Sequence, residues 1–177
     1  AYQLDNNNIL CLVALGNVYQ EIKDFDKAET YLKNALQIDH NDVNALSSYG
    51  DVLFSTKKYD EAIKKYEKAL KFSEIAEVHF NLGHCYYLIE QFDYAVSHYI
   101  NALKIKKNTR HDYYYYLGCA LLANGRLRDA VKCFKGAIKL NKNISVYYYN
   151  LANAYYLFKK YVKGIKQLER CLQVENA

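Results

Sequence analysis

Three residues that could bind a metal ion recur at nearly equal intervals along this chain. Asp51, His84 and Cys119 lie 33 and 35 residues apart. They carry a carboxylate, an imidazole and a thiol, which are the groups that coordinate zinc in proteins. They would form a site only if the fold brought all three to within about 2.0–2.3 Å of one ion. Their spacing indicates an internal repeat, and the elements of that repeat decide where the three side chains lie.

The clearest marker of the repeat is a small residue. Gly16, Gly50, Gly83 and Gly118 are separated by 34, 33 and 35 residues, and Ala152 follows after a further 34. A bulky residue precedes each of them and another comes three positions later: Leu15 and Tyr19, Tyr49 and Leu53, Leu82 and Tyr86, Leu117 and Leu121, Leu151 and Tyr155. The chain therefore contains five copies of one unit of about 34 residues.

A second marker follows at a fixed distance in every copy. It consists of the segments 24–28, 58–62, 91–95, 126–130 and 160–164, each of which ends in Ala or Gly. A large residue comes four positions later and a small one three positions further on: Leu32 and Ala35, Tyr66 and Ala69, Tyr99 and Ala102, Phe134 and Ala137, Leu168 and Cys171. Spacings of three and four place these residues on one helical stripe, so each unit is predicted to be two amphipathic helices. The small residues let two helices approach closely, and the large ones fill the space beside them.

Residues at the expected helix ends support this interpretation. Asn41, Ser73, Asn108 and Asn143 stand just before first helices, where we expect them to be N-caps. Acidic residues fall in the opening turn of second helices, where the helix dipole favours a negative charge: Asp26, Asp60 and Asp93. The chain has no Pro and only seven Gly, which removes the usual turn-forming residues of β-sandwiches and barrels. All of these signals favour an all-α fold.

The repeat resembles the tetratricopeptide repeat over essentially the whole chain. The pattern that carries the resemblance is, in the first copy, Leu12-x-x-Leu15-Gly16-x-x-Tyr19, then Ala28-x-x-x-Leu32 and Ala35, and its four successors match similarly. The family's Trp near the start of the first helix is replaced by Leu, His or Tyr, and its customary Pro between repeats is missing. Pentatricopeptide repeats have a similar period, but the Leu-Gly-x-x-Tyr core and the Ala positions favour the tetratricopeptide family. The resemblance implies a right-handed α–α superhelix, a solenoid of tandem helix-turn-helix repeats.

The repeat also sets the expected boundaries. Residues 1–5 resemble residues 35–39, the end of a second helix, so residues 1–8 are predicted to be the tail of a preceding repeat. Five repeats then form one continuous array, at residues 9–42, 43–75, 76–110, 111–144 and 145–177. No extra polar helix follows the fifth repeat, and repeat arrays need polar end units. We therefore expect an interior part of a longer array.

The predicted fold separates the three candidate metal ligands. Asp51, His84 and Cys119 take the same position in adjacent repeats, and packed helices lie about 8–10 Å apart. They are therefore too far apart to share one zinc ion. The sequence also lacks a Gly-rich phosphate loop and a recognisable nucleophile–base pair. We predict no catalytic residue, no metal and no other cofactor, and a protein that is not an enzyme.

Cysteine usage and hydropathy bear on the compartment. The five cysteines are odd in number and contain no Cys-x-x-Cys pair, which argues against a disulfide framework or a zinc finger. We expect reduced thiols that pack in the core of a cytoplasmic protein, with the nucleus as the other compartment. No apolar run approaches the roughly eighteen residues that cross a bilayer, and no secretory signal is recognisable. We predict no membrane span.

The resemblance implies that the first helices line a concave face on which members of the family bind partners. The predicted partner-binding groove comprises Asn17, Asp51, Phe54, Phe80, Asn81, His84, Tyr87, Tyr115, Tyr116, Tyr149, Asn150, Asn153 and Tyr156. Tyrosine offers a large contact area and a hydroxyl at modest entropic cost, which suits a binding surface. The alternative is that the tyrosine clusters pack between repeats, and Tyr113 and Tyr147 are expected in the core.

Two motifs of peptide-binding family members bear on this groove. Asn81 and Asn150, with Asn17 and Asn153, resemble the asparagines that grip a peptide backbone in some members, and ordinary solvated polar residues are the alternative. The clamp that holds a carboxylate terminus is absent, because the fifth repeat position is never Lys and Glu77 stands where a cation is required. Binding of heat-shock chaperone tails is therefore not expected.

Most lysines lie outside the predicted groove. They gather in or beside the second helices, on the predicted convex face: Lys64, Lys65, Lys68, Lys71, Lys132, Lys135, Lys139, Lys159, Lys160, Lys163 and Lys166. A solvated face is the default reading of such charges. Aromatic side chains could stack on bases, but they are predicted on the opposite face from most lysines. The formal charge of +5 is also too mild for a nucleic-acid signature.

The sequence thus predicts a protein–protein interaction scaffold. Its partner would be another protein or peptide segment, helical or extended and largely apolar or neutral, bound in the aromatic-lined groove within a larger multi-subunit assembly. We expect no small-molecule substrate. The alternative is a structural rod or self-association segment that is contacted through its ends and convex face, and RNA binding is the less favoured third reading.

Overall fold

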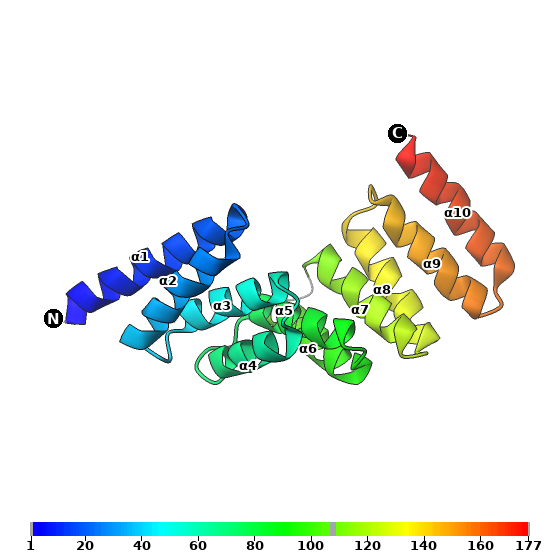
Figure 1. The fold of residues 1–177 in the computed structure, drawn as a ribbon. Helices are drawn as coiled ribbons and strands as arrows, with labels where there is room; N and C mark the ends of the chain where they lie inside the picture. The colour runs from blue at the N-terminus through cyan, green and yellow to red at the C-terminus, as the bar shows by residue number, and fades with distance from the viewer. Residues whose placement is uncertain (1, 107–108, 177) are drawn as a thin grey trace. The chain divides into compact units, whose positions relative to one another are not determined.

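The structure is a computed structural model that describes residues 2–106 and 109–176. Its described residues form ten α-helices and no strand (Figure 1), so the predicted all-α fold is confirmed. The helices are α1 (Tyr2–Glu21), α2 (Phe25–Ile38), α3 (Val43–Ser55), α4 (Tyr59–Leu70), α5 (Ala76–Leu88), α6 (Phe92–Ile105), α7 (His111–Ala123), α8 (Leu127–Leu140), α9 (Ser145–Leu157) and α10 (Tyr161–Glu175). No helix in this part of the chain is long and apolar enough to span a membrane.

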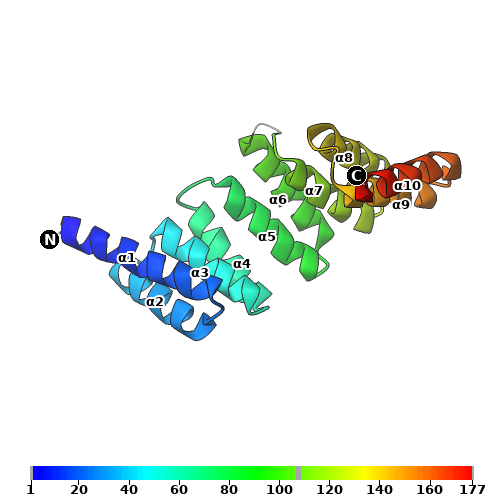
Figure 2. The same ribbon diagram turned by 90° about the horizontal axis from the view of Figure 1, so that it is seen from above.

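The helices belong to two compact units, Ala1–Ile89 and Glu90–Ala177. In the first unit α1 packs against α2, α2 against α3, α3 against α4, and α4 against α5. In the second unit the same order holds from α6 to α10 (Figures 1 and 2). The boundary between the units falls in the turn between α5 and α6, inside the predicted repeat 76–110.

Close approach of two helices within a hairpin depends on glycine. In three hairpins a large side chain of the second helix lies directly over the glycine of the first helix. These large side chains are almost completely buried: Leu32, Tyr66 and Phe134. A Cβ added at the glycine would lie 2.5–2.7 Å from that side chain: Gly16 against Leu32, Gly50 against Tyr66, and Gly118 against Phe134. Carbon atoms in contact prefer about 3.5–4.0 Å, so only glycine fits without repacking. The repeated small residue is therefore a packing requirement.

The last hairpin, α9 with α10, exchanges its two small residues. Ala152 stands where the other four repeats have glycine, and Gly164 stands where they have Ala. A Cβ at Gly164 would lie 3.4 Å from the carbonyl oxygen of Ala152. Leu168 is 43% exposed, whereas its counterpart Phe134 in α8 is fully buried. The difference arises because α9 covers α8, and no described helix covers α10 in the same way.

The predicted N-caps are displaced by one or two residues. The N-caps of α3, α5 and α9 are Asp42, Ile75 and Ile144, where we predicted Asn41, Ser73 and Asn143. The fourth predicted cap, Asn108, lies outside the described residues. Only the α3 cap makes the expected side-chain bond, in which Ala45 N donates to Asp42 Oδ1 at 2.7 Å. Burial of the hairpin faces, more than capping, must therefore fix where α5 and α9 begin.

Two of the residues predicted as caps lie instead in turns formed by the side chains of Asp39 and Asn141. The backbone N–H of Asn41 donates to Asp39 Oδ1 at 2.8 Å, and that of Asn143 donates to Asn141 Oδ1 at 3.1 Å. Both are Asx turns, in which a side chain replaces a backbone turn partner. The acidic first turns were predicted correctly in α2, α4 and α6: Asp26, Asp60 and Asp93.

Helix α1 runs without a break from Tyr2 to Glu21. Residues 2–8 therefore continue into the first helix of the predicted repeat 9–42. The assignment of residues 1–8 to the tail of a preceding repeat stays a prediction.

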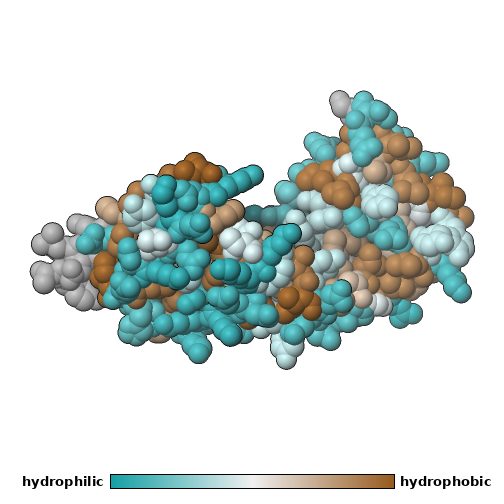
Figure 3. All heavy atoms as spheres, in the orientation of Figure 1, coloured by the Kyte–Doolittle hydropathy of each residue, from teal (hydrophilic) through white to brown (hydrophobic). Residues whose placement is uncertain are grey.

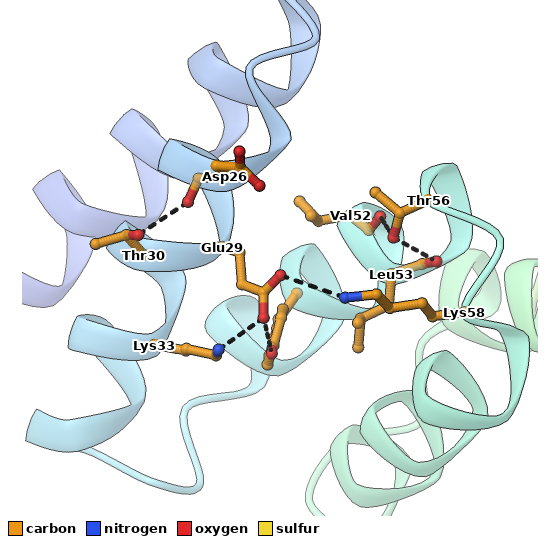
Figure 4. Close-up of polar contacts among 9 residues, drawn as sticks. Asp26, Glu29, Thr30, Lys33, Val52, Leu53, Thr56 and Lys58 are labelled. Carbon is orange, nitrogen blue, oxygen red and sulfur yellow. Dashed lines mark hydrogen bonds and ion pairs between the residues drawn. The ribbon is translucent and has the colours of Figure 1, made fainter.

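A polar contact joins the two hairpins of the first unit. The Glu29 carboxylate on α2 accepts from Tyr49 Oη on α3 at 2.9 Å and pairs with Lys33 Nζ at 2.6 Å (Figure 4). Lys58 Nζ lies 3.8 Å from the second carboxylate oxygen. The hydrogen bond from Lys33 is the main reason that the pKa of Glu29 is lowered, while burial raises the pKa of Tyr49 to about 12.

Candidate partner-binding surface

The predicted groove residues all lie on the first helices of hairpins, but they differ in exposure. Five are exposed: Asn17 on α1, Tyr116 on α7, and Tyr149, Asn153 and Tyr156 on α9. The others are partly buried: Asp51 and Phe54 on α3, Phe80, Asn81, His84 and Tyr87 on α5, Tyr115 on α7, and Asn150 on α9. Most of the exposed members therefore belong to the second unit.

In the first unit the polar groove residues bond to one another. Asp51 Oδ1 on α3 accepts from Tyr66 Oη on α4 at 2.5 Å and from Asn81 Nδ2 on α5 at 2.8 Å. Desolvation raises the pKa of the Asp51 carboxyl, although the two donors partly offset it. Burial also raises the pKa of Tyr66, so its hydroxyl stays protonated and donates. The amide of Asn81, a candidate for gripping a peptide backbone, is used inside the fold.

The aromatic groove residues of the first unit also pack on one another. The His84 ring lies with its centroid 4.5 Å from that of Phe80 and 6.3 Å from that of Phe54, both in edge-to-face geometry. Phe54 in turn contacts Tyr59 at 5.6 Å. Edge-to-face contacts at these distances are stabilising, so this cluster joins α3, α4 and α5. Its rings therefore pack against one another within the first unit.

Tyr115 plays a similar packing role in the second unit. Its ring centroid lies 5.0 Å from that of Tyr147 and 6.1 Å from that of Phe134. Burial raises the pKa of Tyr115, and Asn150 Nδ2 approaches its hydroxyl at 3.4 Å. Asn150 Nδ2 also donates to Val146 O at 3.0 Å. Tyr147 is buried, as predicted.

The exposed tyrosines of α9 border a shallow hollow. Tyr149, Asn153 and Tyr156 line a cavity of about 190 Å³ together with Ala152 and Leu168. The two tyrosines are 56% and 65% exposed. The hollow thus presents two aromatic faces, one amide and aliphatic carbon, which suits an apolar side chain flanked by polar backbone.

A second hollow adjoins the first and extends onto α10. It has a volume of about 250 Å³ and shares Ala152, Tyr156 and Leu168 with its neighbour. Its further lining residues are Tyr161, Gly164 and Ile165. The sequence reasoning missed this side because the resemblance assigned binding to first helices alone. The signal that could have found it was the exchange of Ala152 and Gly164, which marks the last hairpin as different.

The three candidate metal ligands are divided between the two units. Asp51 and His84 belong to the first unit, and Cys119 belongs to the second. Burial raises the pKa of the Cys119 thiol to about 11, so it is not a reactive thiolate at neutral pH. Across residues 2–106 and 109–176, no group of three or more His, Cys, Asp or Glu side chains is arranged to hold a metal ion.

These observations define an all-helical protein of tandem hairpins with exposed aromatic side chains on its second unit. The chain belongs to the tetratricopeptide repeat family, which it matches over residues 5–75, 76–109 and 111–144. The family resemblance and the solenoid fold that were predicted from the sequence are therefore confirmed.

Individual known proteins agree with this assignment. The chain is 32% identical over 122 residues to the BBSome complex member BBS4 of Bos taurus, a match that covers 68% of this chain and 23% of that relative. Among solved structures it is similar to MamA, with a TM-score of 0.87, 22% identity and coverage of 92% and 95% of the two chains. It is also similar to YrrB, described as a TPR protein with an unusual peptide-binding site, with a TM-score of 0.84, 20% identity and coverage of 93% and 85%. The structural likenesses concern the fold alone.

Proposed function

We propose that this protein is an interaction scaffold that binds a largely apolar or neutral segment of another protein on the second unit. The exposed tyrosines of α9 and the two hollows beside them form the proposed contact surface. The single observation that supports it best is the pair of exposed rings, Tyr149 and Tyr156, beside the exposed leucine Leu168. An apolar patch bordered by tyrosine hydroxyls is typical of protein-binding surfaces.

Three further observations support a peptide partner. The two hollows hold about 190 and 250 Å³, which suits single side chains of a peptide. The face of the second unit drawn in Figure 3 carries brown apolar patches among lighter residues. BBS4 is a member of a multi-subunit complex, which is consistent with a scaffold role in a larger assembly. Cytoplasmic localisation remains part of this proposal.

The test begins with peptides selected from a random display library against the whole chain. The affinity of the selected peptides is then measured for the Tyr149→Ala/Tyr156→Ala variant. Truncating two exposed interface rings is expected to weaken binding at least tenfold, because aromatic hot spots contribute about 1–3 kcal/mol each. Unfolding by urea should show little loss of stability, since both rings are largely exposed.

The matched control is Tyr94→Ala, which removes an exposed tyrosine from the second helix α6. This variant should bind the selected peptides as the unchanged protein does. Equal binding by the Tyr149→Ala/Tyr156→Ala variant would refute the proposed surface. Such a result would favour the alternative of a rod that is contacted at its ends or convex face.

A further inference from the structure

Charge is distributed unevenly along the chain. Residues 1–89 contain nine Lys or Arg and thirteen Asp or Glu. Residues 113–168, by contrast, contain ten Lys or Arg and a single acidic residue, Asp129. The formal charge of +5 for the whole chain conceals this difference. A surface with so many cations and so few anions attracts acidic partners and raises their rate of association.

Part of this basic region forms a cleft in the second unit, with a volume of about 290 Å³. We call it the basic–aromatic cleft. It is lined by Arg128, Val131 and Lys132 of α8, by Tyr155 of α9, by Phe158 just after α9, and by Lys160 just before α10. Its aromatic rings are buried or half-buried, whereas its three cations are exposed. The cleft therefore has an apolar floor and a charged rim, and its size suits one or two side chains.

Two of the cations on the rim are available to a partner. Asp129 accepts from Arg126 Nη2 and from Lys132 Nζ, both at 3.2 Å, and the bond from Lys132 is the main cause of its lowered pKa. Within the described residues, neither Arg128 nor Lys160 lies in an ion pair. Lys160 Nζ lies instead 4.2 Å from the centroid of the Phe158 ring. An incoming carboxylate would thus meet charges that are not already neutralised.

The first unit shows that packing does not require a cation at the repeat position of Arg128. A hollow of about 170 Å³ in the first unit matches, position by position, a hollow next to the cleft in the second unit, which shares Arg128 and Phe158 with the cleft. The lining of the hollow in the first unit is mixed in charge: Lys57, Lys58, Tyr59, Asp60, Glu61 and Ile89. Asp60 occupies the repeat position of Arg128, and Ile89 occupies that of Phe158. The hairpin folds with either charge, so the basic rim of the second unit calls for a different explanation.

We propose that the basic–aromatic cleft binds an acidic segment of a partner protein. Carboxylates of the segment would pair with Arg128 and Lys160, and an apolar side chain between them would pack on Tyr155 and Phe158. This pairing joins charge-assisted hydrogen bonds with apolar burial. The cleft uses different residues of α9 from those of the tyrosine surface, so it would be a second contact site.

The geometry favours a peptide over nucleic acid as the source of the negative charge. Binding of single-stranded nucleic acid uses aromatic faces that are open to stacking. Tyr155 is buried and Phe158 is half-buried, so neither offers an open face to a base, whereas a side chain that enters the cleft can contact both. The concave shape and small volume of the cleft likewise suit a protruding side chain better than a flat bilayer surface.

The test uses a fluorescein-labelled peptide, Glu-Glu-Asp-Phe-Asp-Glu-Glu, and its uncharged counterpart, Gln-Gln-Asn-Phe-Asn-Gln-Gln. Anisotropy titrations of the whole chain should show binding of the acidic peptide that weakens as salt is added. The Arg128→Glu/Lys160→Glu variant should lose at least tenfold in affinity. Its control, Lys57→Glu/Lys64→Glu, makes the same change in net charge in the first unit and should lose less than threefold.

Several outcomes would overturn the proposal. These are equal losses in the two charge-reversal variants, equal binding of the uncharged peptide, or no binding of the acidic peptide at low salt. Stronger binding of polyuridylate RNA or of phosphatidylserine vesicles, abolished by Arg128→Glu/Lys160→Glu, would also overturn it. The Tyr149→Ala/Tyr156→Ala variant should bind the acidic peptide normally, which keeps this test independent of the one on the tyrosine surface.

Discussion

The predicted groove residues have different roles in the two units. In the first unit Asp51 accepts hydrogen bonds from Tyr66 and Asn81. The rings of Phe54, Phe80 and His84 pack into one cluster there. In the second unit Tyr149 and Tyr156 project beside two hollows. Equivalent positions of one repeat therefore serve the fold in one place and remain open to a partner in another. The repeat pattern fixes where a side chain lies, whereas its neighbours decide what it can bind.

The largest expected effect comes from breaking the buried network of the first unit. Asp51→Leu removes the acceptor of Tyr66 and Asn81, leaving two partly buried donors without their partner. Each unsatisfied donor costs about 1–3 kcal/mol, so urea unfolding should show a loss of about 2–4 kcal/mol. Asn153→Leu is the matched control, because Asn153 holds the same repeat position on α9 but is exposed. Its effect should stay within about 0.5 kcal/mol, and equal losses would contradict the contrast.

A smaller effect should appear in the pH dependence of stability. The folded state raises the pKa of Asp51 above its ordinary value of 3.8, so it binds the proton more tightly than the unfolded chain does. The contribution of this group to stability therefore falls as pH rises from about 3.8 through the folded pKa, and is constant above it. Asp51→Asn keeps an acceptor for Tyr66 but cannot titrate.

The measurement is urea unfolding of the two proteins from about pH 4 to about pH 7. The stability of the unchanged protein should decrease relative to Asp51→Asn across the lower part of this range. A difference that is independent of pH, or that changes in the opposite direction, would show that the carboxyl is not desolvated as the structure indicates.

The smallest effect concerns thiol reactivity, and it leaves the fold unchanged. Cys85 lies buried on α5, and its pKa is raised to about 12 by burial, whereas Cys11 on α1 is exposed. Iodoacetamide followed by peptide mass mapping should therefore modify Cys11 at least tenfold faster than Cys85. In Asp51→Leu, loosening of the first unit should speed modification of Cys85, while the rate at Cys133 of the second unit should stay the same. Comparable rates at Cys11 and Cys85 in the unchanged protein would contradict the burial described for α5.

Much of the fold could be predicted because it depends on spacing along the chain. The recurrence of glycine and of a large residue in the next helix foretold contacts such as Gly50 with Tyr66. The N-caps were less predictable, because several Asp and Asn residues precede these helices: the side chains of Asp39 and Asn141 form Asx turns, while that of Asp42 caps α3. Local sequence does not resolve that competition.

The candidate site was predicted less completely for a related reason. The bond network of Asp51 requires side chains from α3, α4 and α5 to meet, and no spacing rule specifies their directions. Leu168 and Tyr161 were missed because their exposure depends on what covers α10, not on their position in the repeat. The sequence identifies the residues of the repeat, but it does not show which of their side chains are bonded or packed within the fold and which stay exposed.

The central claim is that partner binding concerns the exposed tyrosines of the second unit and not the closed network of the first. The most direct test is fluorine NMR of the chain labelled with 3-fluorotyrosine, titrated with a peptide from the display selection. Signals are assigned with single Tyr→Phe variants. We predict that the resonances of Tyr149 and Tyr156 shift with the added peptide while that of Tyr66 does not. A shift at Tyr66, with Tyr149 and Tyr156 unchanged, would contradict the account.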